Sequence, residues 1–251
     1  MEQRLVGYFD FLGFRSALKG ADEEREGRIL HILTQLARAT TDASYRRTDN
    51  GDRTSHSIRP AFTAFSDNIV YSHPASHVDA VGMGPVCIAL AQDAARVFSQ
   101  AITIGCLVRG GIAIGKMHHE GGVAFGPAFV EAYELESQFA NTPRIILSKL
   151  ASERIPQHPY VSTDMDGFST LNYVRAAYDQ IPSGPPGVSE QWADKRAWIA
   201  MVQRVCAQQI AAMEDTSNLH GLSKWRWFSS YFEAFVAGLH PSITGRSLVP
   251  Q

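Results

Sequence analysis

Residues 5–14 read LVGYFDFLGF, and this stretch decides how the chain begins to fold. Residues 5–11 are dense in aromatic and β-branched side chains, which is typical of a buried strand. Gly13 follows at the point where the strand has to turn, so we expect the strand to lead directly into a helix. A carboxylate, Asp10, lies at the end of this apolar strand.

Helical and extended patterns alternate through the rest of the N-terminal part. Residues 21–45 predict a helix, because Ile29, Ile32 and Leu36 recur at helical spacing. Residues 46–59 are polar and rich in turn formers, which is typical of an exposed loop. Residues 61–65 and 68–72 predict two strands joined by a tight turn at Ser66-Asp67. The pattern then predicts a helix over 77–100, a strand over 103–115, a turn over 118–122, a helix over 127–140 and a strand over 144–147.

The order of these elements predicts an α+β fold. A βαββαβ core forms a ferredoxin-like antiparallel sheet with its helices on one face. Residues 1–150 would make up this core. Residues 151–251 contain a loop rich in Pro and Gly and two long helical stretches, near 188–214 and 222–238. We expect this C-terminal extension to pack on the core or on a partner chain.

Composition excludes several classes of protein. The 251 residues are 45% hydrophobic, and 23 Lys and Arg against 25 Asp and Glu leave a net charge of -2. No global basic field would therefore recruit nucleic acid. No apolar run is long enough for a membrane span, and the first residues lack a signal core. The three scattered cysteines form neither a disulfide framework nor a metal knuckle, so we expect a cytoplasmic protein.

Two carboxylates are the first candidates for chemistry. Asp10 closes the first strand, and Asp67 lies in the hairpin turn. A hairpin beside the first strand would bring them together, where they repel unless a cation lies between them. Mg²⁺ and Mn²⁺ prefer such oxygen ligands, with phosphate oxygens completing the shell. The alternative is that Asp67 is an ordinary turn residue and Asp10 a helix cap.

A phosphate-binding pattern lies close to Asp10. The residues Gly13-Phe14-Arg15-Ser16 open a helix whose free backbone N–H groups could hold phosphates, and Arg15 adds charge. Arg109 lies within the apolar, glycine-flanked stretch LVRGGIAIG, where a lone guanidinium is costly unless an anion meets it. The alternative for Arg109 is an ion pair with a structural carboxylate. Metal ligands, amide groups and arginine together describe a nucleoside triphosphate site.

These residues resemble the catalytic domain of class III nucleotide cyclases over roughly residues 5–150. The family's first metal strand, Phe-x-Asp-Ile-x-Gly-Phe, is similar to residues 8–14, and its hairpin Gly-Asp to Ser66-Asp67. Its Arg-x-Gly-x-x-x-Gly strand is similar to residues 109–115. Its glycine-opened helix ending in Arg-Leu-Glu is similar to residues 126–136.

The resemblance implies a set of site residues. Asp10, Asp67 and the Phe11 carbonyl would hold two Mn²⁺ or Mg²⁺ ions per site. The substrate-binding residues would be Tyr8, Gly13, Phe14, Arg15 and Arg109, although Tyr8 is equally well explained as a core tyrosine. Such sites form across a dimer interface, so a homodimer is expected.

The chain departs from the purine cyclases where they read the base. Their base-reading Lys and Asp fall on Thr63 and Val123, and their transition-state Asn and Arg fall on Val130 and Glu134. In these positions the chain resembles the pyrimidine cyclases of bacterial Pycsar anti-phage systems. That resemblance implies cyclisation of UTP or CTP to a 3′,5′-cyclic monophosphate. A separate effector would sense this product rather than the protein.

Several alternatives stay open at this point. The chain could be a catalytically inactive, nucleotide-binding module of the same fold, or a purine cyclase. The residue that would replace the missing transition-state Arg is undecided among Lys116, Arg144 and Lys224. His118-His119-Glu120 could bind a metal, although a polar hairpin turn explains it better.

Overall fold

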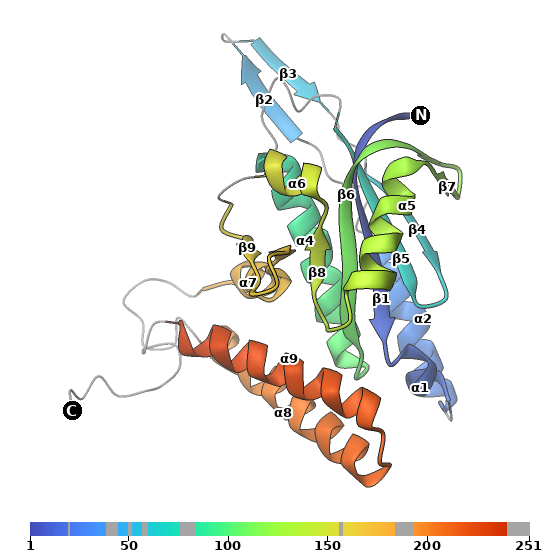
Figure 1. Ribbon diagram of the computed structural model, residues 1–251, viewed down its shortest axis with the longest axis vertical. Coiled ribbons are helices and arrows are strands. Elements are labelled where there is room, and N and C mark those ends of the chain that lie inside the picture. Colours follow the sequence, from blue (N-terminus) through green and yellow to red (C-terminus); the bar gives the residue numbers. More distant parts are fainter. Residues whose placement is uncertain are drawn as a thin grey trace, which may run out of the picture.

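The computed structural model is an α+β fold built on a mixed eight-stranded sheet (Figure 1). It describes residues 1–19, 21–38, 60–75, 84–155, 158–183 and 193–239, and the backbone alone of 45–49 and 52–56. The elements of the N-terminal half are β1 (Glu2–Leu12), α1 (Phe14–Leu18), α2 (Glu23–Arg38), β2 (Tyr45–Asp49), β3 (Asp52–His56), β4 (Ala61–Phe65), β5 (Asn68–Pro74), α4 (Gly84–Thr103) and β6 (Leu107–Glu120). The elements that follow are β7 (Val123–Phe125), α5 (Pro127–Glu134), a π-helix (Leu135–Phe139), β8 (Ile145–Leu147), α6 (Lys149–Arg154), β9 (Val161–Thr163), β10 (Ser169–Leu171), α7 (Tyr173–Gln180), α8 (Ala193–Asp215) and α9 (Leu219–Ala237).

The strand β1 lies in the middle of the sheet, as its apolar sequence predicts. The strands follow the order β4-β5-β1-β6-β8-β10-β9, and β7 pairs with β6. β1 is antiparallel to both β5 and β6, but β6 and β8 are parallel. The expectation of a purely antiparallel sheet is therefore wrong for one pair. The reason is the connection from β6 to β8, since a crossover through a helix such as α5 joins parallel strands.

Helices cover both faces of the sheet, so the expectation of helices on one face is also wrong. Leu5 and Phe9 of β1 belong to the main core with residues of α2 and α4. Val6 and Tyr8 point the other way and pack beneath α5, against Ala128 and other residues. Figure 1 shows α4 and α5 on opposite sides of β1 and β6. Both faces of β1 are apolar, and an apolar face has to be covered.

The C-terminal residues join the same core. The hairpin of β9 and β10 extends the sheet beyond β8, and α7 packs against α4. The helices α8 and α9 pack against each other, and Phe228 of α9 contacts Phe98 of α4 with their ring centroids 5.6 Å apart. Ile199, Val202 and Phe232 belong to the main core cluster as well.

Several element boundaries differ from those expected. The predicted loop at 46–59 contains the paired strands β2 and β3, and the sequence between them is Asn50-Gly51, a strong hairpin signal. β6 continues through His118 and His119 to Glu120, so the predicted turn is confined to Gly121-Gly122. The first residues of the helices predicted over 77–100 and 188–214 lie outside the described residues. No helix in the described ranges is both long and apolar enough to cross a membrane.

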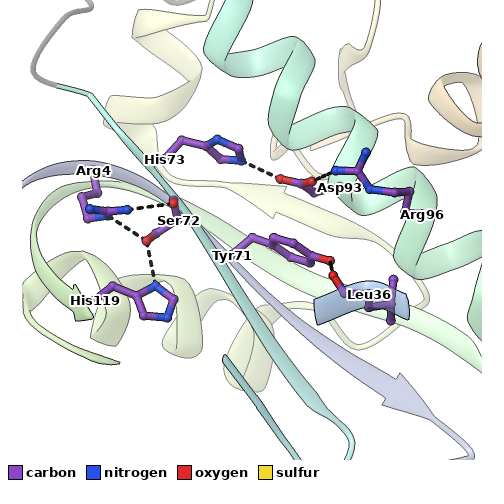
Figure 2. Close-up of polar contacts among 8 residues, drawn as sticks. All are labelled: Arg4, Leu36, Tyr71, Ser72, His73, Asp93, Arg96 and His119. Atoms are coloured by element: carbon purple, nitrogen blue, oxygen red, sulfur yellow. Dashed lines mark hydrogen bonds and ion pairs between the residues drawn. The ribbon is translucent and has the colours of Figure 1, made fainter. Parts of the chain in front are cut away.

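Buried polar contacts tie β5 to both neighbouring layers (Figure 2). On one face, His73 Nε2 lies 2.5 Å from Asp93 Oδ2 on α4, and Tyr71 donates a 3.0 Å hydrogen bond to the Leu36 carbonyl. On the opposite face, Arg4 Nε donates to Ser72 Oγ at 2.7 Å, and His119 Nδ1 lies 2.7 Å from the same oxygen. His73 Nδ1 is buried and has no hydrogen-bond partner among the described residues. All of these groups lie away from the end of β1 that carries Asp10.

Candidate functional site

The structure brings Asp10 and Asp67 to one end of the sheet. Asp10 lies opposite Asn68 in the pairing of β1 with β5, next to the turn that holds Asp67. The backbone N–H of Phe11 donates a 2.9 Å hydrogen bond to the Asp67 carbonyl. Ser66 takes a left-handed conformation with φ of 57°, which closes the tight turn. The hairpin therefore juxtaposes the two acids, as the sequence predicts.

A cleft of about 330 Å³ opens at this point. Gly13, with φ of 94°, turns the chain from β1 into the five-residue helix α1 along one wall. The end of α8 and the first turns of α9 contribute further lining residues. The cleft is lined by Asp10, Phe11, Leu12, Gly13, Phe14, Arg15, Ser16, Asp67, Leu107, Met213, Asn218, His220, Gly221, Lys224 and Trp225.

Asp10 is a buried carboxylate with an arginine partner. Arg109 lies opposite it in the pairing of β1 with β6, and Arg109 Nε donates to Asp10 Oδ2 at 2.9 Å. Burial raises the pKa of Asp10 and Arg109 opposes this rise, while the charge of Asp67 adds to it. Arg109 Nη1 lies 3.5 Å from the Ala140 carbonyl, and Nη2 has no hydrogen-bond partner among the described residues.

Glu136 contacts Arg109 and does not line the cleft, and sequence reasoning did not single it out. It is buried on the π-helix, and its Oε1 lies 2.6 Å from Arg109 Nε. The single Nε–H points to Asp10, so Glu136 Oε1 has no hydrogen bond at all. Burial raises the pKa of Glu136 to about 7, although Arg109 acts in the opposite direction. The only sequence signal for Glu136 was its position at the end of a helix motif. A π-helical turn has no recognisable sequence pattern, so the direction of this side chain could not be predicted.

The oxygen atoms of Asp10, Asp67 and Phe11 suit a hard divalent cation. Asp67 Oδ1 accepts a 3.1 Å hydrogen bond from Asn68 Nδ2, whereas Asp10 Oδ1 and Asp67 Oδ2 have no hydrogen-bond partner among the described residues. Each carboxylate therefore has one oxygen for an outside ligand. The described residues hold no cluster of three or more His, Cys, Asp or Glu arranged for a metal, so water or substrate oxygens would have to complete the coordination.

Two cationic side chains line the cleft without an ion-pair partner among the described residues. Arg15 is exposed on α1, and Lys224 is half-buried on α9. Of the three residues considered for the missing transition-state arginine, Lys224 alone lies here. Arg144 pairs with Asp164 and with Asp166, at 3.1 and 2.5 Å. Lys116 is exposed on β6 opposite Gln3, far along the strand from Arg109.

The structure places the remaining predicted residues away from the cleft. The Tyr8 ring packs edge-on against Phe129 and Tyr133, and its hydroxyl donates to Asn68 Oδ1 at 2.5 Å. Thr63 Oγ1 lies 2.9 Å from His119 Nε2, and Val123 is 54% exposed on β7. None of these three lines the cleft with Asp10, so a base held near Thr63 or Val123 would contact a different surface of the molecule.

No protein-family model matches the chain, and no curated protein matches it in sequence.

Proposed function

We propose that the chain is a nucleotide cyclase that converts UTP or CTP to the 3′,5′-cyclic monophosphate and pyrophosphate. The observation that carries the proposal is the meeting of Asp10 and Asp67 in a cleft that also holds Arg15 and Lys224. Carboxylates that bind divalent cations, beside side chains that bind phosphate oxygens, are the requirements of a nucleoside triphosphate site.

The arrangement of the strands supports this assignment. The order β4-β5-β1-β6, with β1 antiparallel to both neighbours, is the strand order of a ferredoxin-like βαββαβ core. Class III cyclases, which the sequence motifs resemble, have a core of this kind. The residues of those motifs lie at the ends of β1 and of the β4–β5 hairpin and on β6, which also supports the proposal.

The residues assigned to the site would have separate roles in the proposed reaction. Bound divalent cations would lower the pKa of the ribose 3′-hydroxyl and neutralise charge on the triphosphate. Asp10, Asp67 and the Phe11 carbonyl would hold those cations. Arg15 and the backbone N–H groups of Gly13 and Phe14 would bind the β- and γ-phosphates. Arg109 is not among the residues that line the cleft, so its role would be to orient Asp10 through Nε.

The second candidate is a nucleotide-binding module without catalysis. It is favoured by Arg109, whose Nε is already engaged by Asp10 and adjacent to Glu136. An arginine held in this way forms structural ion pairs, which stabilise the fold whether or not the protein is catalytic. A purine cyclase is the third candidate, and Thr63 and Val123 in place of the base-reading Lys and Asp argue against it.

The proposal includes a homodimer and a role in anti-phage signalling. Large apolar side chains are exposed on β7, α5 and the π-helix, which is consistent with an interface to a second copy; they are Val123, Phe125, Val130, Tyr133 and Phe139. The cyclic product, rather than the protein, would act on a separate effector.

The test is to incubate the protein with each of the four nucleoside triphosphates and Mn²⁺, and to identify the products by mass spectrometry. A cyclic product from UTP or CTP alone supports the proposal. A product from ATP or GTP indicates a purine cyclase, and binding without any product indicates the inactive module.

The matched variants are Asp67→Asn and Asp22→Asn. Asp67→Asn should abolish turnover, by at least about a thousandfold, because a neutral amide binds a divalent cation poorly. Asp22 is exposed and caps the Arg25 N–H at 2.9 Å, which Asn does equally well, so Asp22→Asn should keep full activity. A correctly folded Asp67→Asn protein with normal turnover would rule out the two-metal site.

A further inference from the structure

We propose that Lys224, on helix α9 of the C-terminal extension, binds the polyphosphate of the substrate in the same cleft as Asp10 and Asp67. The inference rests on the proposed function for the identity of the nucleotide. If Lys224 has this role, the C-terminal extension forms part of the site in the same chain as Asp10 and Asp67. The core motifs do not include any residue of this extension.

The packing of helix α9 on the core holds Lys224 at the cleft. His220, Lys224 and Trp225 of α9 line the cleft together with residues of β1 and α1. Trp225 is buried, with 3% of its surface exposed, and belongs to the main core cluster, and Phe228 on the same helix contacts Phe98 of α4. The helix that carries Lys224 is therefore fixed against the core, and the lysine is held at the cleft.

The charges around Lys224 also favour a bound anion. Lys224 forms no ion pair with any described residue. Burial and the charge of Arg109 lower its pKa, and the charges of Asp10 and Glu136 oppose this. Arg109 already neutralises part of that negative charge through its contact with Asp10. A half-buried ammonium with no partner of its own is stabilised when an anion binds. Arg15 also lines the cleft, so an anion bound there would have two cationic side chains within the same site.

The size of the anion follows from the same geometry. A volume of about 330 Å³ suits a small ligand, and the two carboxylates would repel a bare anion. A phosphate chain with divalent cations between it and Asp10 and Asp67 satisfies both sets of charges. Its far oxygens would then be free for Lys224, whose compact ammonium binds phosphate as a point charge.

The experiment measures binding without requiring turnover. Inorganic pyrophosphate is titrated in the presence of Mg²⁺ into the full chain by calorimetry, for the wild type, Lys224→Gln, Lys224→Arg and Arg226→Gln. Arg226 is the matched control because it lies two residues away on the same helix, is exposed, and pairs with Glu214 at 2.7 Å. Thermal unfolding of each variant checks that the fold is kept.

We expect Lys224→Gln to weaken pyrophosphate binding by about tenfold or more, since it removes a charge-assisted contact. Lys224→Arg should keep more of the affinity than Lys224→Gln, and Arg226→Gln should bind as the wild type does. Equal affinity of Lys224→Gln and the wild type would overturn the inference, and so would a wild-type protein that does not bind pyrophosphate.

Assays of nucleotide turnover on the same preparations separate this inference from the proposed function. One outcome is that Lys224→Gln binds pyrophosphate more weakly while the wild type makes no cyclic product from any nucleotide. This result would support the role of Lys224 in phosphate binding and refute the proposed cyclase activity. The other outcome is that the wild type is active and Lys224→Gln keeps a normal KM for the nucleotide and normal pyrophosphate binding. This result would refute the role of Lys224 and would not affect the proposed cyclase activity.

Discussion

Arg109 has one Nε–H and two carboxylates within reach of it. The hydrogen bond goes to Asp10 at 2.9 Å, and Glu136 is left 2.6 Å from the same nitrogen without a hydrogen bond. A buried carboxylate without a hydrogen-bond donor is costly when ionised. Because the Nε–H of Arg109 is used by Asp10, the protonation of Glu136 is coupled to the stability of the fold.

Replacement of Glu136 by Gln should change the pH dependence of stability. The pKa of Glu136 is raised from an ordinary 4.5 to about 7 in the folded chain, so the folded state holds a proton that the unfolded state has lost. The stability from this group is present below about pH 4.5 and is lost as pH rises to about 7. Glu136→Gln should lack this loss and should be more stable than the wild type at pH 8.

Urea unfolding between pH 5 and pH 8 checks this prediction. Glu120→Gln, an exposed substitution on β6, serves as the control and should follow the wild-type profile. If the stability of Glu136→Gln declined with pH as steeply as that of the wild type, Glu136 would not be the group responsible.

His119 should show the opposite dependence on pH. Burial lowers its pKa from 6.5 to about 4, and the charge of Arg4 adds to the effect. The folded state then binds fewer protons than the unfolded state, so stability is complete above about pH 6.5 and is lost as pH falls toward 4. An NMR titration should give a midpoint near 4 for the His119 ring, identified by the signal that disappears in His119→Gln. A midpoint near 6.5 would show that the ring is not buried in this way.

Helix α5 lies unusually close to β6, and Gly111 is the reason. A Cβ added at Gly111 would lie 2.0 Å from the Ala132 carbonyl oxygen and 2.8 Å from Leu135 Cβ. The backbone atom cannot move aside as a flexible side chain could, so this position requires glycine. The close packing also fixes the π-helix that follows α5, and with it the place of Glu136.

Gly111→Ala should therefore destabilise the protein by at least about 3 kcal/mol. The control is Gly27→Ala in the interior of α2, where an added Cβ would meet nothing within 4 Å. That substitution should stabilise the protein by about 0.5–1 kcal/mol, since Ala is the better helix former. Midpoints of urea unfolding measure both changes, and a Gly111→Ala protein of normal stability would mean that α5 does not pack so closely.

At the level of elements, the sequence was informative where a local pattern determined the structure. Strand β1 and the hairpin of β4 and β5 follow from apolar runs and the Ser66-Asp67 turn, and so does the meeting of Asp10 and Asp67. The strands β2 and β3 were expected as a loop, because their polar composition outweighed the Asn50-Gly51 signal. The short strands β9 and β10 have only three residues each, too few for a periodic pattern.

At the level of the whole molecule, long-range contacts decided what the sequence could not. The aromatic residues of 222–238 predicted a helix packed on the core or on a partner chain, but no local pattern relates that helix to Asp10. Its place depends on Trp225 and Phe228, which pack against residues distant in the sequence. Lys224 enters the cleft as a consequence of that packing, so its role could be inferred only from the folded chain.

Phe228→Ala tests whether the sheet and the C-terminal helices form one cooperative unit. Phe228 is fully buried, and its ring contacts those of Phe98, Trp225 and Phe232. Its truncation should cost about 3–5 kcal/mol. All four tryptophans lie between residues 192 and 227, so their fluorescence reports on the C-terminal part, while hydrogen exchange of the β1 amides reports on the sheet. If the chain unfolds as a unit, both probes should report the same decrease in the free energy of unfolding. A loss confined to the fluorescence transition would mean that the helices detach from a sheet that stays folded, and the wall of the cleft that carries Lys224 would then open independently of Asp10 and Asp67.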